Sequence, residues 1–126
     1  MVFRIKKFCR KDGRKFFLSN NFKVAFELKL DGVYLPSFNN DLKHRIYPRR
    51  KNFLILGSAH NYIELKQKEI QNVDIIFLAS LFNKKKTYLG INRFISLSKL
   101  TKKKLVALGG INNTNLNKLR LLNIYG

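Results

Sequence analysis

The chain has 126 residues, a formal net charge of +19 and 45% hydrophobic residues, which suits one domain with a packed core and excludes intrinsic disorder. No apolar run reaches the roughly 18 residues of a membrane-spanning helix, and the first residues lack the apolar stretch of a secretion signal. The single cysteine, Cys9, excludes an intramolecular disulfide and a zinc site with several thiolates. We therefore expect a cytoplasmic protein that does not associate with membranes.

The excess of basic residues, 26 Lys+Arg against 7 Asp+Glu, is typical of nucleic-acid binders. Abundant lysine, asparagine and isoleucine with little alanine and glycine is also typical of a gene poor in G and C, so mutational bias explains part of the charge. The basic clusters, 49–51, 84–86 and 102–104, are spread along the chain. Nucleic-acid binding is therefore the hypothesis ranked last.

Short apolar runs alternate with segments of helical period, which predicts βα units and a parallel sheet. In the first half we predict strands at 16–18, 32–35 and 53–56, the last ended by Gly57. A helix capped by Asn20 follows the first strand, and one or two helical turns lie within 41–47. The apolar face of the capped helix is expected to contain Phe22, Ala25, Phe26 and Leu28.

In the second half we predict strands at 74–78 and 105–108, and a polar loop at 83–90. Asn61 is expected to cap a helix over 62–71, and Asn113 or Thr114 to cap a closing helix. The side chains expected to face the sheet are Ile63, Leu65 and Ile70 in the first of these helices, Phe94, Leu97 and Leu100 in the helix after the loop, and Leu116, Leu119 and Leu122 in the last.

Five parallel strands fit either an open doubly wound sheet or part of a closed barrel, and their spacing does not choose between them. In both architectures ligands bind where the carboxyl ends of the strands share one edge. The residues that follow the predicted strands therefore form the candidate site: Ser19, Asn20, Pro36, Ser37, Asn39, Ser58, His60, Ser80, Lys84, Lys85, Lys86, Gly109, Gly110 and Asn112.

Two features of this set indicate phosphate binding, and a third indicates proton transfer. The Gly109–Gly110 pair after a strand allows a close approach of an anion to the backbone, although such a pair is more often only a tight turn. One lysine of Lys84, Lys85 and Lys86 is expected to contact a phosphate, the alternative being a solvated loop. His60 is a candidate general acid or base, the alternative being packing on the helix that begins at Asn61.

Other polar residues are expected outside the site. His44 is predicted to be solvated. Asp31, Asp74 and the lysines 102–104 precede their strands, so they belong to the opposite edge of the sheet. The predicted ligand edge therefore lacks carboxylates.

Four segments occur in the order and approximate spacing of the thiamine phosphate synthase and thiazole tautomerase (TenI-like) superfamily, and the chain resembles this superfamily from about residue 14 to its end. They are Leu30-Asp31-Gly32-Val33-Tyr34-Leu35, Gly57-Ser58-Ala59-His60-Asn61, Asp74-Ile75-Ile76-Phe77-Leu78-Ala79-Ser80-Leu81-Phe82 and Ala107-Leu108-Gly109-Gly110-Ile111. The resemblance implies an α/β fold, a partial TIM (β/α)8 barrel of about five βα units that correspond to family strands three to seven. Residues 1–126 would then be one incomplete barrel domain, a fragment without the first two βα units and the last.

The resemblance implies a thiamine phosphate synthase, a transferase that joins hydroxymethylpyrimidine pyrophosphate to thiazole phosphate and releases pyrophosphate with the help of magnesium. Ser58, Gly109 and Gly110 match family residues that contact phosphates, and the loop of Lys84 to Lys86 matches a loop whose lysine neutralises pyrophosphate. His60 matches the proton-shuttling histidine of the tautomerase branch. The implied partner is a phosphorylated small molecule: thiazole phosphate, pyrimidine pyrophosphate or thiamine phosphate.

The chain departs from the superfamily at its metal site, because the two magnesium-binding aspartates align with Asn20 and Asn39. Neutral amides remove the charge that holds a hard cation, so the sequence assigns no metal ligand and leaves magnesium an open question. Three functions remain: the synthase reaction, a tautomerase-like isomerisation that needs His60 but no metal, and non-catalytic binding of a phosphorylated ligand.

Overall fold

The computed structural model describes residues 1–83 and 88–126, in which five parallel strands form one curved sheet in the order β1-β2-β3-β4-β5. The strands are β1 (Phe17–Ser19), β2 (Gly32–Leu35), β3 (Leu54–Ala59), β4 (Ile75–Ala79) and β5 (Lys104–Leu108). The helices are α1 (Val2–Lys11), α2 (Phe22–Glu27), α3 (Tyr62–Ile70), α4 (Gly90–Ser98) and the 3₁₀ helices η1 (Lys43–Ile46) and η2 (Leu116–Leu121).

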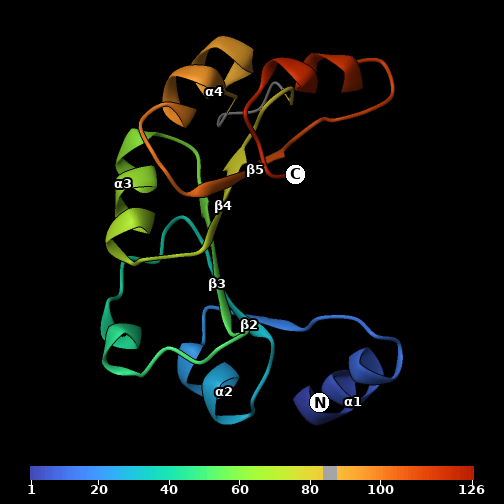
Figure 1. Ribbon diagram of the computed structural model, residues 1–126, viewed down its shortest axis with the longest axis vertical. Helices are drawn as coiled ribbons and strands as arrows, with labels where there is room; N and C mark the ends of the chain where they lie inside the picture. Colours follow the sequence, from blue (N-terminus) through green and yellow to red (C-terminus); the bar gives the residue numbers. More distant parts are fainter. Residues whose placement is uncertain (84–87) are drawn as a thin grey trace.

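The strand order decides the architecture that the spacing left open. Each strand pairs in parallel with the next one in the sequence, whereas a doubly wound sheet reverses its order at a switch point. Helices α2, α3 and α4 lie on one side of the curved sheet, and its other side is open (Figure 1). A sequential parallel sheet with helices only on its convex side is the arrangement of a (β/α)8 barrel, here with five strands.

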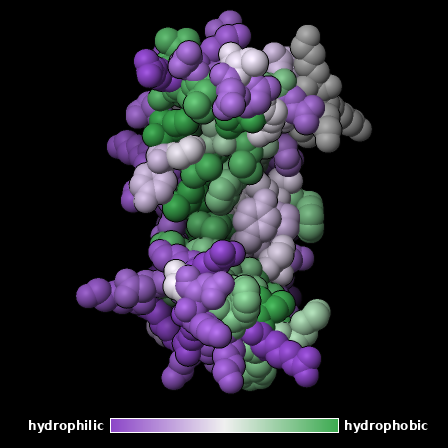
Figure 2. Space-filling view, turned by 90° about the vertical axis from the view of Figure 1, so that its right-hand side faces the viewer, coloured by the Kyte–Doolittle hydropathy of each residue, from purple (hydrophilic) through white to green (hydrophobic). Residues whose placement is uncertain are grey.

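The core lies between the sheet and these three helices. Alternate strand residues point toward the helices and are buried, among them Val33, Ile55, Ile76 and Leu105. Their neighbours in the strands face the open side, where a band of apolar side chains crosses the molecule between polar regions (Figure 2). Tyr34 and Phe77 pack edge to face on this side, with ring centroids 6.2 Å apart.

The end of the chain continues the sheet beyond β5. The backbone N–H of Tyr125 donates to the oxygen of Leu105, and the N–H of Ala107 donates to the oxygen of Gly126. These bonds satisfy backbone groups on an edge that would otherwise be open. The last residues therefore lie where the next strand of a barrel would begin.

The structure confirms the five strands to within a few residues and corrects several details. Gly57 was predicted to end the third strand but lies inside β3. A Cβ atom at this position would meet the side chains of Lys68 and Val73. Asn21 caps α2 instead of Asn20, by accepting from the N–H of Val24. The closing helix is a short 3₁₀ helix without a side-chain cap from Asn113 or Thr114; the Asn112 side chain instead bonds the turn before it.

Some predicted buried residues are exposed. Ile63, Ile70, Leu100 and Leu116 were predicted to face the sheet, yet each exposes about half of its surface or more. On α3 the buried positions are Leu65 and Lys68 instead. Helix α1 was not predicted, although Val2, Ile5 and Cys9 recur at helical spacing; none of its residues is buried. Within the described part of the chain, none of the helices has the length and apolar content needed to span a bilayer.

Candidate functional site

The carboxyl ends of the strands lie along one edge of the sheet, as predicted, and the predicted site residues that the structure describes lie at this edge. Asn20 and Asn39 follow β1 and β2. Ser58, Ser80 and the Gly109–Gly110 pair lie on or after β3, β4 and β5, while His60 turns toward α3. Ser19 ends β1 and is exposed on the same edge. Lys84, Lys85 and Lys86 lie outside the described residues.

Asn20 and Asn39 are bonded to each other. The side-chain oxygen of Asn39 accepts from Gln71 Nε2 at 3.1 Å and from the backbone N–H of Asp41 at 2.8 Å. This fixes the orientation of the amide, so its Nδ2 faces Asn20 and donates to Asn20 Oδ1 at 2.5 Å. The Asn20 backbone N–H in turn donates to the oxygen of Tyr34, which ties the residue to the end of β2.

These two side chains do not fit the magnesium site that the superfamily implies. Magnesium needs oxygen ligands, preferably carboxylates, and the amide of Asn39 presents an N–H toward its partner. Among residues 1–83 and 88–126, no group of three or more His, Cys, Asp or Glu side chains could hold a metal ion. The pair offers hydrogen-bond donors, which favour an anion over a cation.

A cavity of about 330 Å³ lies beside the asparagine pair. Its lining includes Lys23 of α2 and Lys43 of η1, together with the carboxylate of Asp41. The volume is in the range of a small ligand or several water molecules. Basic and amide groups therefore share this end of the edge.

The glycine pair lets the ends of β4 and β5 approach each other closely. A Cβ atom on Gly109 would lie 2.2 Å from Ser80 Oγ, and one on Gly110 would lie 2.8 Å from the Asn83 backbone nitrogen. Both glycines have positive φ, 107° and 71°, which side chains disfavour. Ser80 is buried, and its hydroxyl donates to the oxygen of Asn83 at 3.2 Å. The pair thus brings two strand ends together.

Ser58 is buried on the open side of the sheet, opposite Phe77 of β4. Its side chain is on the same side of the sheet as Tyr34. Tyr34 pairs in register with Leu56, and Leu56 lies two residues before Ser58 in β3. Ser58 is therefore on the side of the sheet that corresponds to the inside of a barrel.

His60 is held by Glu64, a residue that the sequence analysis did not single out. The Glu64 carboxylate lies 3.0 Å from His60 Nδ1 and accepts from the His60 backbone N–H at 2.7 Å. Asn61 caps the same helix by accepting from the Glu64 N–H at 2.9 Å. The sequence signal was present: an acidic residue three positions after the cap is the capping-box pattern.

Among residues 1–83 and 88–126, the other ring nitrogen of His60, Nε2, makes no hydrogen bond, and an imidazole nitrogen in this position can take up or release a proton. His60 lines a cavity of about 310 Å³ whose other residues include Arg93 of α4. The alternative prediction, that His60 packs on the helix after it, is therefore partly correct, since the ring contacts Glu64 of α3. The same contact orients the ring as a carboxylate orients a catalytic histidine.

A buried lysine organises the loop that carries Asn39. Lys68 of α3 is fully buried, and its ammonium group donates to the backbone oxygens of Pro36 and Asn39 at 2.7 Å each and to Gln71 Oε1 at 2.8 Å. Burial lowers the pKa of Lys68 from its usual 10.5 to about 8. One indirect signal of this lysine is Gly57, whose missing side chain leaves room for the Lys68 side chain.

The prediction that His44 is solvated is wrong. The ring is buried, and its Nε2 lies 2.8 Å from the backbone oxygen of Gln71. It also packs against Phe22, with ring centroids 5.4 Å apart. Asp31 and Asp74 lie on the opposite edge as predicted, where they bond the backbone N–H groups of Phe16 and Ile55.

The comparison with protein families decides the family of the chain. The model described as thiamine monophosphate synthase matches residues 1–126. The chain belongs to the thiamine monophosphate synthase family. This confirms the resemblance drawn from the four sequence segments.

Curated relatives agree with this family assignment. The chain is 32% identical over 125 residues to the thiamine-phosphate synthase of Pelagibacter ubique, with 94% of this chain and 59% of that protein covered. It is 27% identical over 127 residues to the enzyme of Methanococcus vannielii, with 98% and 61% covered. The chain therefore spans about three-fifths of the length of these relatives.

A solved structure supports the fold. The thiamine phosphate pyrophosphorylase from Pyrococcus furiosus superposes with a TM-score of 0.73 and 23% identity, over 95% of this chain and 59% of that one. At this identity the similarity concerns the fold. It shows that five sequential parallel strands with helices on one side form part of a barrel of this type.

Proposed function

We propose that this family member acts in thiamine biosynthesis by binding a phosphorylated small molecule at the carboxyl edge of its sheet, as a thiamine-phosphate synthase does. The observation that carries the proposal is the convergence of Ser58, Ser80 and the Gly109–Gly110 pair at the ends of three neighbouring strands. Hydroxyl groups and backbone amides brought together in this way are suited to phosphate oxygens. We place the protein in the cytoplasm, where such substrates are made.

In the synthase reaction the ring nitrogen of thiazole phosphate attacks the methylene carbon of the pyrimidine, and the bond from that carbon to pyrophosphate breaks. The negative charge that develops on the leaving pyrophosphate needs cations or hydrogen-bond donors. In this chain the amide of Asn39 and the basic residues Lys23 and Lys43 are the described groups that supply them near β1 and β2. Lys84 to Lys86 are proposed to supply further positive charge.

Isothermal titration calorimetry with thiamine phosphate and with pyrophosphate tests the binding step. We expect both to bind, and Ser58→Ala to weaken thiamine phosphate by about tenfold, the loss of one hydrogen bond to a charged group. Ser96→Ala, which alters a hydroxyl bonded within α4, is the control and should leave binding unchanged. Absence of heat at millimolar ligand with the folded protein would refute the proposal.

A second candidate is a tautomerase-like isomerisation, favoured by the contact between His60 and Glu64 at 3.0 Å. A carboxylate on Nδ1 leaves Nε2 to take a proton from one carbon of a thiazole carboxylate phosphate and return it to another. Proton exchange into deuterated water, followed by NMR, would detect this reaction. We expect His60→Ala to abolish the exchange and Glu64→Gln to slow it, whereas His44→Ala would affect only stability. Unchanged exchange in His60→Ala would exclude this function.

A further inference from the structure

The opposite edge of the sheet, at the amino ends of the strands, gathers basic residues that are far apart in the sequence. The connections that lead into β1, β2, β3 and β5 each place exposed cations there, including Lys15, Lys29, Lys51 and Lys102. Because the strands are parallel and adjacent, their amino ends form one continuous edge. Charges that are scattered along the chain thus form one surface, which we call the basic edge: Lys15, Lys29, Arg50, Lys51, Lys102 and Lys103.

The carboxylates at this edge already have partners. Asp31 accepts from the backbone N–H of Phe16 at 2.7 Å. Asp74 holds both guanidinium nitrogens of Arg49 at 3.0 Å, and Glu69 accepts from Lys66 at 2.8 Å. Asp74 and Glu69 are thus paired with cations, whereas Asp31 keeps its charge. Because the basic side chains of the edge outnumber the carboxylates, its net potential stays positive.

The basic edge is hollowed where it meets the core. One hollow of about 540 Å³ is lined by three cations, Lys29, Arg50 and Lys51, and one carboxylate, Asp31. A second of about 380 Å³ is lined by Lys99, Lys102 and Lys103 with the carboxylate of Glu69. Arg50 is held in place, since its guanidinium lies 3.6 Å from the centroid of the Phe26 ring and donates to the Phe26 oxygen at 2.5 Å. Concave basic surfaces of this kind are suited to phosphate groups.

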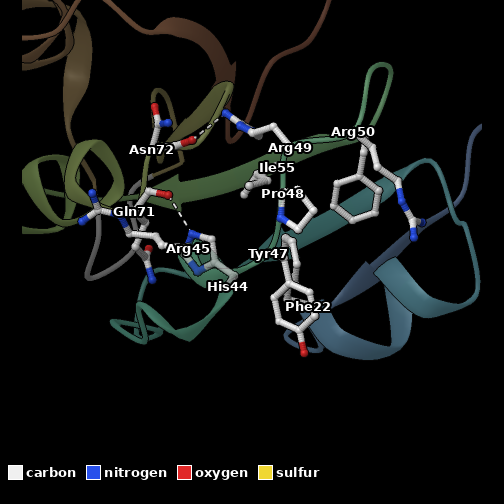
Figure 3. Close-up of a pocket in the computed structure, with 11 residues that line it drawn as sticks. Phe22, His44, Arg45, Tyr47, Pro48, Arg49, Arg50, Ile55, Gln71 and Asn72 are labelled. Carbon is white, nitrogen blue, oxygen red and sulfur yellow. Dashed lines mark hydrogen bonds between the residues drawn. The ribbon is translucent and has the colours of Figure 1, made fainter.

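An aromatic cavity adjoins the first hollow, with which it shares Arg50 and Phe53. It has a volume of about 100 Å³ and is lined by residues of α2, of η1 and the segment after it, and of the end of α3. Phe22, Tyr47 and Phe53 supply its ring walls, with centroids of Phe22 and Tyr47 5.2 Å apart. Figure 3 shows Tyr47 and Pro48 beside the arginines 49 and 50, with Ile55 behind them.

We propose that the basic edge and the adjoining aromatic cavity bind single-stranded nucleic acid. The lysines and Arg50 contact successive phosphates, and the aromatic cavity receives an unstacked base against Tyr47. Flat rings next to a cationic groove are the combination that single strands require, because every base has a face that stacks on an aromatic ring. Of the apolar residues at this edge, Leu30 and Phe53 are buried and Leu100 is about half exposed, so vesicles of anionic lipid are included in the test below.

Fluorescence anisotropy with labelled oligo-uridine and oligo-thymidine of about 12 nucleotides, over a range of salt concentrations, tests this proposal. Lys29→Ser/Lys51→Ser should weaken binding about tenfold and make the salt dependence shallower by about 1.4, which is two phosphate contacts on a single strand. Tyr47→Leu should weaken binding about tenfold without changing that slope, because stacking releases no counterions.

The matched control is Lys118→Ser/Arg120→Ser, which removes the same charge from η2, in red at the far end of Figure 1. We expect it to retain affinity within about twofold, with thermal melts confirming that all variants fold. Equal losses in both pairs would overturn the proposal, since net charge alone would then explain binding. Binding to phosphatidylserine vesicles without binding to oligonucleotides, or equal affinity for uridine monophosphate and the oligomer, would also overturn it.

Discussion

The ammonium nitrogen of Lys68, on α3, lies 2.7 Å from the backbone oxygen of Asn39, in the loop that follows β2. Through this bond and those to Pro36 and Gln71, a buried cation holds the loop that presents Asn39 to Asn20. The helix layer therefore determines the geometry of the candidate site.

Replacement of Lys68 by methionine is expected to lower the free energy of unfolding by about 2–3 kcal/mol, because three oxygen acceptors lose their buried donor. Urea denaturation measures this change. The control is Lys66→Met on the same helix, whose ion pair with Glu69 lies at the surface and is expected to contribute much less to stability. Equal effects of the two substitutions would show that Lys68 does not hold the loop.

The stability contributed by Lys68 should depend on pH. Its pKa is about 8 in the folded protein and 10.5 in the unfolded chain, so between these values the unfolded chain binds more protons. The free energy of unfolding should therefore rise with pH across this window, relative to Lys68→Met. Denaturation of both proteins at intervals from pH 7.5 to pH 10 measures the difference, and a difference that stays constant or falls would contradict the assignment.

Substitution of Gly109 by alanine should be far more destabilising than the same change at Gly13. Both residues have positive φ, 107° and 64°, so both substitutions carry a conformational cost of about 1–2 kcal/mol. Only at Gly109 would the new Cβ meet another atom, Ser80 Oγ at 2.2 Å, whereas nothing lies within 4 Å at Gly13. We expect an additional loss of about 1–3 kcal/mol at Gly109. Similar melting temperatures for the two variants would disprove the close contact.

The double substitution Asn20→Asp/Asn39→Asp should create a magnesium site at the position of the amide pair. Two facing carboxylates supply the charge and oxygens that the amide pair does not. We expect 10 mM magnesium chloride, roughly ten times a millimolar dissociation constant, to raise the stability of this variant by about 1.4 kcal/mol. The natural chain should show no such increase, and an equal increase in both would mean that magnesium binds elsewhere.

Local apolar runs were sufficient to predict the five strands, because one face of each strand packs on the helices and the other face also carries apolar side chains on the open side of the sheet (Figure 2). The strand at 32–35 was predicted with its observed bounds. Burial on the helices was predicted less well. Leu65, Phe94 and Leu97 are buried as expected, but Ile63 and Ile70 are exposed because the buried side of α3 contains Lys68. Helical period alone does not show that a charged residue will find three partners inside the protein.

The sequence by itself determined the fold class, the family and the edge at which the candidate ligand residues lie, since these depend on the order of strands and on short segments next to them. Tertiary structure decided which residues meet. It brought Lys68 and Gln71 to Asn39, Glu64 to His60, and Phe22, Tyr47 and Phe53 to the basic edge at Arg50. The basic residues behind the +19 charge are scattered along the sequence. Some of them form the basic edge only because the parallel strands align their amino ends.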